Sequence, residues 1–584
     1  MNGNSETIQG GVAGKAGTSR RALFQGALMA AGIAHGQERS LPKQTGTEPA
    51  PAARRAPATV PPQPVVETAA GKVRGYCLNG VYAFKGIPFG APTGGALRFQ
   101  RPAKPAPWPG IRSSVHYGHI CPSGDYWSDP QDNAPHSDED AYLLYRTYWT
   151  PAGEDCLRLN VWTPGLAAST RKRPVLVFMH GGGFSGGSGH DLLAYDGENL
   201  AHRNDVVVVT HNHRLNVFGY LNLAEIGGER FASSANVGML DLVAALEWVR
   251  DNISTFGGDP GNVTIFGQSG GGGKVSALMA MPEAKGLFQR AAIQSWPFQR
   301  LPLPAESGSL AAGVLAELNL GKSQVAQICD VPIGRLIEAS QAALRKVPRP
   351  AADGRWTGWG PTVDGKILPT DPVDPAAPVI SPQVPLLVGT TLNEFVSGLD
   401  NAEVETLTGG QLADRARQRW GSAGKDIVEA YRREYPKATP FRLWAAISTA
   451  SVRQSTATHA EHRAAAGAAP VYQYIFGWQT PVLDGRPGTF HACDIAFVFD
   501  NVDRCVRQTG GVPAALALST QTSRAWVNFA RHGNPDHAGL PHWPAYEATR
   551  RSTMFLDSPC FVKGDPEGAG LRLIRQSSGP RGTP

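Results

Sequence analysis

Short hydrophobic runs alternate with stretches of helical character through the middle of the chain. The runs at 175–179 (VLVFM), 206–210 (VVVVT) and 263–266 (VTIF) are rich in Val, Ile, Leu and Phe and show little polar alternation. Strands of this kind are covered on both faces, as in a parallel sheet between two layers of helices. Further strands are expected at 72–76, 157–163, 291–294, 386–389 and 472–476.

The stretch 237–252 carries apolar residues at helical spacing, which predicts an amphipathic helix. These residues are Leu240, Leu242, Ala245, Leu246 and Val249. Alternating strands and helices are typical of the α/β class. No linker-like stretch divides residues 65–562. We therefore predict one α/β domain there, with a mostly parallel central sheet, helices on both faces and long loop insertions.

Both ends of the chain differ from this central domain. Residues 19–24 (SRRALF) form a twin-arginine pattern, and the apolar stretch that follows is too short to span a bilayer. We expect residues 1–36 to be a twin-arginine signal peptide that directs the protein to the periplasm or out of the cell. Residues 37–64, rich in Pro and Ala, are predicted to be a linker, and residues 563–584 a flexible tail.

The formal net charge of +6 is concentrated at the two ends of the chain. Residues 1–60 hold seven Lys or Arg against three Asp or Glu, and residues 563–584 hold four against two. The body of the chain is therefore close to neutral, which argues against nucleic-acid binding. Beyond the signal, no run of roughly eighteen apolar residues occurs, so we expect no stable membrane anchor. The oligomeric state stays open.

Residues 267–271 (GQSGG) place Ser269 in a Gly-x-Ser-x-Gly turn between a β-rich run and a helix-competent stretch. This context is that of a nucleophile elbow, in which small neighbours let the backbones around a strained serine pack closely. The N-terminus of the following helix places partial positive charge near a developing oxyanion. A phosphate-binding loop is excluded, because Gln268 stands where its first glycine belongs and Val275 follows Lys274.

The run 180–183 (HGGG) directly follows the expected strand at 175–179. Gly181, Gly183 and Gly186 fit the spacing of a dinucleotide-binding fingerprint, but no helix-forming stretch follows them. We therefore interpret this run as an oxyanion loop, whose backbone N–H groups face a carbonyl oxygen under attack.

Several longer motifs resemble, in order, those of the type B carboxylesterase and cholinesterase-like family. They are 84–89 (FKGIPF), 97–99 (LRF), 154–161 (EDCLRLNV), 180–184 (HGGGF), 236–241 (NVGMLD), 256–260 (FGGDP) and 533–535 (GNP). The resemblance runs from about residue 71 to residue 546 and is to bacterial carboxylesterases of the para-nitrobenzyl esterase type. It implies the α/β-hydrolase fold and a serine esterase activity.

The resemblance also implies the catalytic partners of Ser269. The segment 389–394 (GTTLNE) matches the acid segment of the family, which makes Glu394 the triad acid. The segment 490–499 (FHACDIAFVF) matches the histidine segment, which makes His491 the general base. Serine, acid and histidine then follow one another along the chain in the order typical of α/β-hydrolases.

By the same resemblance, the oxyanion donors are the backbone amides of Gly182, Gly183 and Gly270. Ser295 matches a family serine that supports the triad from behind, although an ordinary serine at a strand end also fits that position.

The chain has seven cysteines, and none lies in a CxxC or zinc-binding pattern. Cys121 and Cys156 resemble the first loop disulfide of the family. Cys493 and Cys505 are close in sequence and form a further candidate pair. The odd number leaves at least one thiol free or bonded to another molecule. No metal or cofactor is expected.

Two residues depart from the family pattern. Gln268 stands where the residue before the nucleophile is usually acidic, so cationic choline esters are not expected as substrates. Trp296 stands where the family is often small, and it either narrows the acyl pocket or packs inside the protein.

The predicted function is hydrolysis of carboxylic esters through an acyl-enzyme, on uncharged small-molecule esters of small or medium size. Amides, carbamates or polymeric esters are alternative substrates. A non-catalytic binding protein is a further alternative, disfavoured because such relatives typically lack a triad residue and this chain has all three.

Overall fold

The computed structural model describes residues 63–123, 143–144, 150–166, 172–298, 300–347, 355–399, 401–467 and 469–577. All of them belong to one compact unit that begins at Pro62. The predicted signal peptide and nearly all of the predicted linker lie outside the described residues.

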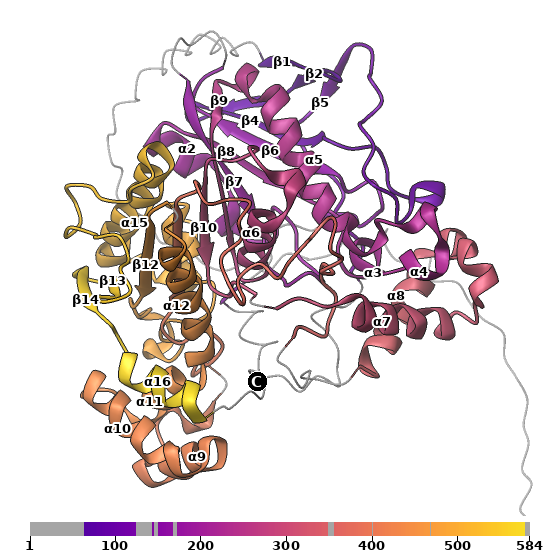
Figure 1. The fold of residues 1–584 in the computed structure, drawn as a ribbon. Coiled ribbons are helices and arrows are strands. Elements are labelled where there is room, and N and C mark those ends of the chain that lie inside the picture. The colour runs from indigo at the N-terminus through magenta and orange to yellow at the C-terminus, as the bar shows by residue number, and fades with distance from the viewer. Residues whose placement is uncertain are drawn as a thin grey trace, which may run out of the picture. The chain divides into compact units, whose positions relative to one another are not determined.

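Eleven strands of the described chain form one twisted mixed sheet (Figure 1). In spatial order they are β14 (Phe561–Gly564), β13 (Ser552–Leu556), β12 (Val471–Phe476), β11 (Leu386–Thr391), β10 (Arg290–Gln294), β9 (Gly258–Gln268), β7 (Arg173–Met179), β8 (Val207–His211), β6 (Arg158–Thr163), β4 (Val81–Pro88) and β3 (Tyr76–Leu78). Neighbours from β13 to β8 run parallel, whereas β14 at one edge and β6, β4 and β3 at the other run antiparallel. The predicted mostly parallel sheet is confirmed.

The central strands are largely hydrophobic because each contributes to two cores. Val175 and Val177 of β7 pack in one buried cluster, and Leu176 and Phe178 pack in the other. The first cluster lies under α5 (Val237–Asn252), α6 (Gly270–Ala280) and α12 (Ala450–Ala465), and the second under α2 (Glu198–Asn204) and α15 (Pro513–His532). Helices thus cover both faces of the sheet, as Figure 1 shows.

The expected strand at 72–76 is wrong as a single element. Its first part is β2 (Gly71–Arg74), which pairs with β1 (Val65–Thr68) and β5 (Ile111–Ser113) in a separate three-stranded sheet. The chain then passes Gly75 and enters β3 of the large sheet. A side chain at Gly75 would lie 2.3 Å from the carbonyl oxygen of Ala83, so this sharp transition depends on glycine.

The remaining helices lie in several separate stretches of the chain. They are α3 (Asn216–Tyr220), α4 (Ala224–Gly227), α7 (Pro304–Glu317), α8 (Ile333–Arg345), α9 (Gly409–Trp420), α10 (Gly424–Glu434), α11 (Pro440–Ser448), α13 (Ile495–Val498), α14 (Val506–Thr509) and α16 (Gly568–Ser577). α9, α10, α11 and α16 enclose a third, smaller core. All of these helices except α16 lie in segments between strands, where the sequence predicts long insertions.

The expectation of a flexible tail from residue 563 is wrong as far as residue 577. β14 ends at Gly564 and α16 follows, with Ile574 buried in the third core. Glu567, between them, is buried and pairs with Arg453 of α12 at 2.5 Å. The amphipathic pattern of α16 and this ion pair hold the segment on the domain.

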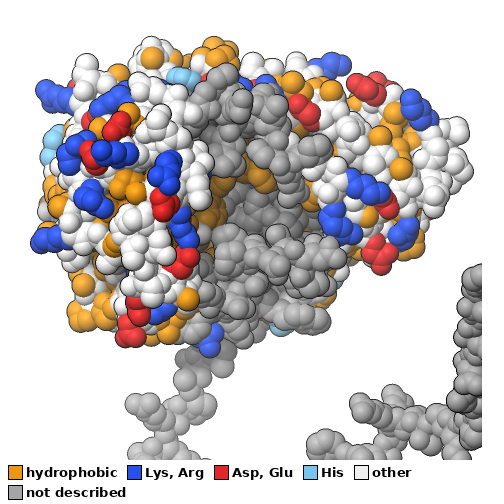
Figure 2. Space-filling model, turned by 90° about the horizontal axis from the view of Figure 1, so that it is seen from below, with side chains coloured by type: hydrophobic (Ala, Val, Ile, Leu, Met, Phe, Trp, Pro, Cys, Tyr) orange, Lys and Arg blue, Asp and Glu red, His pale blue; other side chains and the backbone are white. Residues whose placement is uncertain are grey.

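The surface carries charges of both signs. In the part of the face that Figure 2 colours by side-chain type, Lys and Arg are interspersed with Asp and Glu. This distribution agrees with the near-neutral body of the chain. Among the described helices, none has the length and apolar character needed to cross a membrane.

Candidate active site

The predicted catalytic residues lie after the carboxyl ends of neighbouring parallel strands. Ser269 follows β9, Ser295 follows β10, and Glu394 and His491 lie in the loops after β11 and β12. Ligand sites of open α/β sheets are found at this edge, where the loops from adjacent strands converge.

Ser269 occupies a strained turn between β9 and α6. Its backbone has φ +57° and ψ −123°, and its N–H donates to the carbonyl oxygen of Gln294 at 2.8 Å. A Cβ on Gly271 would lie 1.9 Å from the carbonyl oxygen of Met179, and one on Gly267 would lie 2.5 Å from Gly271. Only glycine permits this approach, so the glycine pattern in the sequence is a requirement of the turn.

Glu394 is buried and fixed by three hydrogen bonds. Its Oε1 accepts from the hydroxyl of Ser295 at 2.8 Å and from the N–H of Thr391 at 2.9 Å. Its Oε2 lies 2.5 Å from Nδ1 of His491. The carboxylate therefore holds the imidazole with Nδ1–H toward the acid and the Nε2 lone pair directed outward. The support from Ser295 that the sequence suggests is present in this geometry.

The outward nitrogen of His491 contacts Gln268. The side-chain Nε2 of Gln268 lies 3.1 Å from Nε2 of His491 and donates a hydrogen bond to it. Among the described residues, the hydroxyl of Ser269 has no hydrogen-bond partner. The structure thus brings Glu394 and His491 together, with Ser269 as the next residue after Gln268, but it does not join Ser269 to His491. Catalytic hydrogen bonds are often formed only when substrate is bound.

The three glycines predicted as oxyanion donors lie against one another. Gly182 and Gly183 have φ values of +86° and +60°, which favour glycine. A Cβ on Gly270 would lie 2.4 Å from the backbone nitrogen of Gly183. No described acceptor takes the N–H of any of the three. Two segments far apart in sequence therefore present unused donors at one point beside Ser269.

Aromatic side chains line the same end of the sheet. The ring of Phe395 packs on His491 with centroids 4.1 Å apart, and Trp296 contacts Phe395 at 5.4 Å and Phe298 at 5.9 Å. Phe298 in turn packs against Trp356 at 5.1 Å. Trp296, for which the sequence leaves two roles open, is a packed member of this wall. The sequence reasoning missed Phe395, although it adjoins Glu394 directly.

Asp494 is a second buried acid near the triad. Its Oδ2 accepts from Nε2 of Gln294 and from the hydroxyl of Tyr474, both at 3.0 Å. Burial raises the pKa of Asp494 to about 6, and the nearby Glu394 adds to this shift.

The predicted disulfide between Cys121 and Cys156 is not formed in the structure, where all seven cysteines are free thiols. The two side chains are nevertheless buried and hydrogen-bonded to each other, which raises the pKa of Cys156 well above its ordinary value. Cys493 and Cys505 are buried and free as well.

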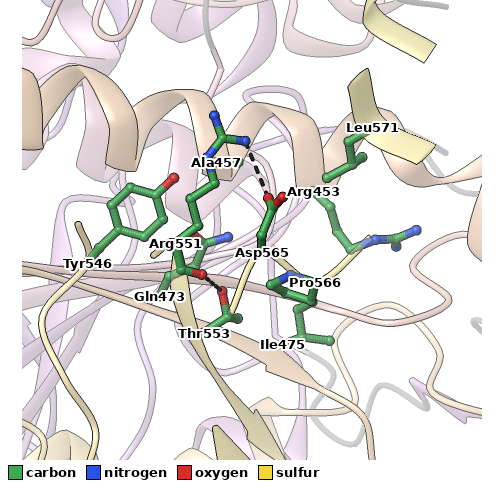
Figure 3. A pocket seen from close by; sticks show the side chains of 10 residues that line it. All are labelled: Arg453, Ala457, Gln473, Ile475, Tyr546, Arg551, Thr553, Asp565, Pro566 and Leu571. Atoms are coloured by element: carbon green, nitrogen blue, oxygen red, sulfur yellow. Dashed lines mark hydrogen bonds and ion pairs between the residues drawn. The ribbon is translucent and has the colours of Figure 1, made fainter. Parts of the chain in front are cut away.

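A separate small, partly open pocket lies between α12, β12, β13 and the start of α16 (Figure 3). Arg551 and Asp565 face each other there with their nearest atoms 3.4 Å apart. The rest of its polar lining comes from Arg453, Gln473, Tyr546 and Thr553. No triad residue borders this pocket, so it is not the predicted ester site.

The sheet, the strained serine turn and the acid–histidine pair define a serine hydrolase of the α/β-hydrolase fold. The chain belongs to the carboxylesterase family, whose model matches residues 62–563. The protein is a carboxylic ester hydrolase, and the alternative of a non-catalytic binding protein is not favoured.

This chain aligns with nearly the whole length of relatives of known activity. The para-nitrobenzyl esterase of Bacillus subtilis is 35% identical over 88% of this chain and 99% of its own. The phenmedipham hydrolase of Pseudarthrobacter oxydans is 31% identical over 87% and 96%. A solved esterase of Clostridium hathewayi, described as hydrolysing aliphatic aromatic polyesters, superposes with a TM-score of 0.76 at 37% identity, covering 89% of this chain and 99% of that one.

Proposed function

We propose that Ser269, His491 and Glu394 hydrolyse uncharged carboxylic esters of small or medium size through an acyl-enzyme. The observation that carries this proposal is the 2.5 Å contact between Glu394 and Nδ1 of His491, beside the strained turn of Ser269. A buried carboxylate in this position orients the ring and stabilises the imidazolium that forms during attack.

The reaction proceeds in two steps. The hydroxyl oxygen of Ser269 attacks the ester carbonyl carbon while Nε2 of His491 takes its proton. The N–H groups of Gly182, Gly183 and Gly270 hold the negative oxygen, each contributing roughly 3 kcal/mol. His491 returns the proton to the departing alcohol, and water then hydrolyses the acyl-enzyme by the same route. The amide of Gln268 releases Nε2 when substrate brings Ser269 into reach.

The character of the site supports uncharged substrates. Gln268 contributes no negative charge beside His491, and the rings of Trp296, Phe298 and Phe395 form an apolar wall near it. Such surroundings favour the burial of an apolar acyl or aryl group, and the neutral Gln268 supplies no charge to offset the desolvation of a cation.

The test compares purified wild-type protein with Ser269→Ala and with Ser276→Ala, a control in the same helix. The hydroxyl of Ser276 bonds only to the backbone of α6. We expect Ser269→Ala to abolish hydrolysis of p-nitrophenyl esters and covalent labelling by a fluorophosphonate, and Ser276→Ala to retain both. Full activity of Ser269→Ala would refute the assigned nucleophile.

A panel of esters from acetate to laurate, with neutral, anionic and choline alcohol groups, tests the substrate class. Neutral esters of short and medium acyl length should give the highest kcat/KM. A preference for the choline ester, or for a carbamate or polyester included in the panel, would contradict the proposed class.

We further propose that the protein is exported by its twin-arginine signal and that Cys121 and Cys156 form a disulfide after export. The adjacent buried thiols and the oxidising compartment support this pairing. Replacing Arg20 and Arg21 by Lys should retain the protein in the cytoplasm. Non-reducing peptide mapping of exported protein should recover the two cysteines in one linked fragment, and free thiols there would refute the pairing.

A further inference from the structure

Lys274 is a completely buried lysine beside the oxyanion loop. It lies on α6, one helical turn beyond Ser269, and its side chain has no exposed surface. Its Nζ donates a hydrogen bond of 2.9 Å to the carbonyl oxygen of His180. His180 directly precedes the three glycines that include the oxyanion donors, so the lysine binds the loop at its base.

Glycine packing at the start of α6 makes this contact possible. A Cβ on Gly271 would lie 1.9 Å from the carbonyl oxygen of Met179 and 3.0 Å from that of His180. The helix therefore runs directly against the end of β7 and the first peptide of the loop. In the sequence, the glycine run and Lys274 only resemble a phosphate-binding loop that the spacing excludes. The structure gives the glycine run and Lys274 a different role.

A second hydrogen bond, from the ring of His180 itself, also fixes the loop. Nδ1 of His180 lies 2.9 Å from the carbonyl oxygen of Gly181, so the ring donates to the first glycine of the loop. Two successive carbonyl groups, those of His180 and Gly181, are therefore each held by a hydrogen bond. Their peptide planes fix the direction in which the following N–H groups point.

The surroundings of Lys274 are buried and contain, besides His180, two further histidines: His211 at the end of β8 and His213 just after it. The ring of His213 lies 4.8 Å from that of His180 and 5.7 Å from that of His211. Burial and the neighbouring lysine lower the pKa of His211 to about 3 and hold those of His180 and His213 well below their ordinary values. Burial lowers the pKa of Lys274 itself to about 7, against the opposing attraction of Asp191.

We propose that Lys274 is a positioning residue of the oxyanion hole, which fixes the carbonyl of His180 and thereby the orientation of the Gly182 and Gly183 amides. The inference deepens the proposed esterase function and rests on it. Lys274 does not touch substrate and acts through the loop. Its burial is unfavourable for folding, since a lysine loses hydration there, so a role in stability alone does not account for it.

The experiment compares Lys274→Met, Lys274→Gln and the control Ser276→Ala with the wild type on p-nitrophenyl acetate. Rates are normalised to the concentration of labelled Ser269, so that misfolded protein does not count. The binding of a trifluoromethyl ketone, which forms an oxyanion adduct with the serine, is measured in parallel with thermal unfolding.

We expect Lys274→Met to lower kcat about 100-fold with KM changed less than about threefold, and to weaken the ketone by a similar factor. Lys274→Gln, which keeps an N–H donor, should lower kcat about tenfold. The melting temperatures of the two variants should not fall in proportion to their losses of kcat. Wild-type kcat and ketone affinity in both folded variants would overturn the inference. Losses of kcat that vanish after normalisation to labelled serine would also overturn it, as would a failure of both variants to fold. Inactivity of the wild type on every ester would instead refute the esterase proposal.

Discussion

The side-chain amide of Gln268 lies 3.1 Å from Nε2 of His491, the nitrogen that acts as the base in the proposed mechanism. Gln268 precedes Ser269 in the chain, so the amide competes with the serine hydroxyl for the same lone pair. It also places a neutral group where a carboxylate would favour the charged imidazole. The residue before the proposed nucleophile thus contacts the proposed base directly.

Gln268→Glu should move the acidic limb of the pH–rate profile to higher pH by about one unit. A carboxylate beside the ring favours the protonated imidazole, which cannot act as a base. The profile of kcat/KM on a neutral ester measures this shift. The control Gln268→Met removes the amide without adding charge and should leave the limb in place. If the acidic limb of Gln268→Glu did not shift, the side chain at position 268 would not contact His491 in solution.

Gly270→Ala should lower kcat by roughly 10²–10³-fold, because one oxyanion donor is displaced. The added methyl group would lie 2.3 Å from the carbonyl oxygen of Gly183, and backbone atoms must move to admit it. Gly308→Ala in α7 is the matched control, since a methyl group there meets nothing within 4 Å. Steady-state kinetics normalised to labelled serine distinguish the two. Equal activity in both variants would argue against Gly270 as a donor.

Asp494 should make the folded protein less stable as the pH rises from about 4 to about 6. Its folded pKa of about 6 exceeds the ordinary value of 3.8, so the folded state binds more protons than the unfolded state in this window. The loss is about 3 kcal/mol and is complete above this range. Urea unfolding at about pH 4.5 and about pH 7.5 measures it. Asp494→Asn, which keeps an acceptor for Gln294 and Tyr474, should reduce the difference between the two values.

Glu567→Gln should destabilise the domain by about 3–5 kcal/mol, because it leaves the buried guanidinium of Arg453 without a counter-charge. Arg453 and Glu567 are 3% and 0% exposed, and Tyr431 and Tyr435 also donate to Glu567. Thermal or urea unfolding checks the loss. Glu547→Gln, in an exposed pair with Arg550, is the control and should change stability by less than about 1 kcal/mol. A neutral effect of Glu567→Gln would mean that α16 does not depend on this pair.

The hydrophobic pattern was sufficient to predict the central sheet and α5. Strands such as β7 and β8 are rich in apolar residues because both faces are buried, and that property is local to each segment. The glycines around Ser269 were equally informative, since a strained turn requires small residues at adjacent positions. The partners Glu394 and His491 required the resemblance to a family, because residues that are distant in sequence carry no mark of their proximity.

By itself, then, the sequence determined the α/β class, the strained serine turn and the glycine loop after β7, because each rests on residues that are neighbours along the chain. Tertiary structure alone decided the contact of Gln268 with His491, the hold of Lys274 on His180 and the packing of α16 through Glu567 and Arg453. These contacts depend on how strands and helices far apart in sequence converge. A buried lysine or glutamate is indistinguishable from an exposed one until that packing is known.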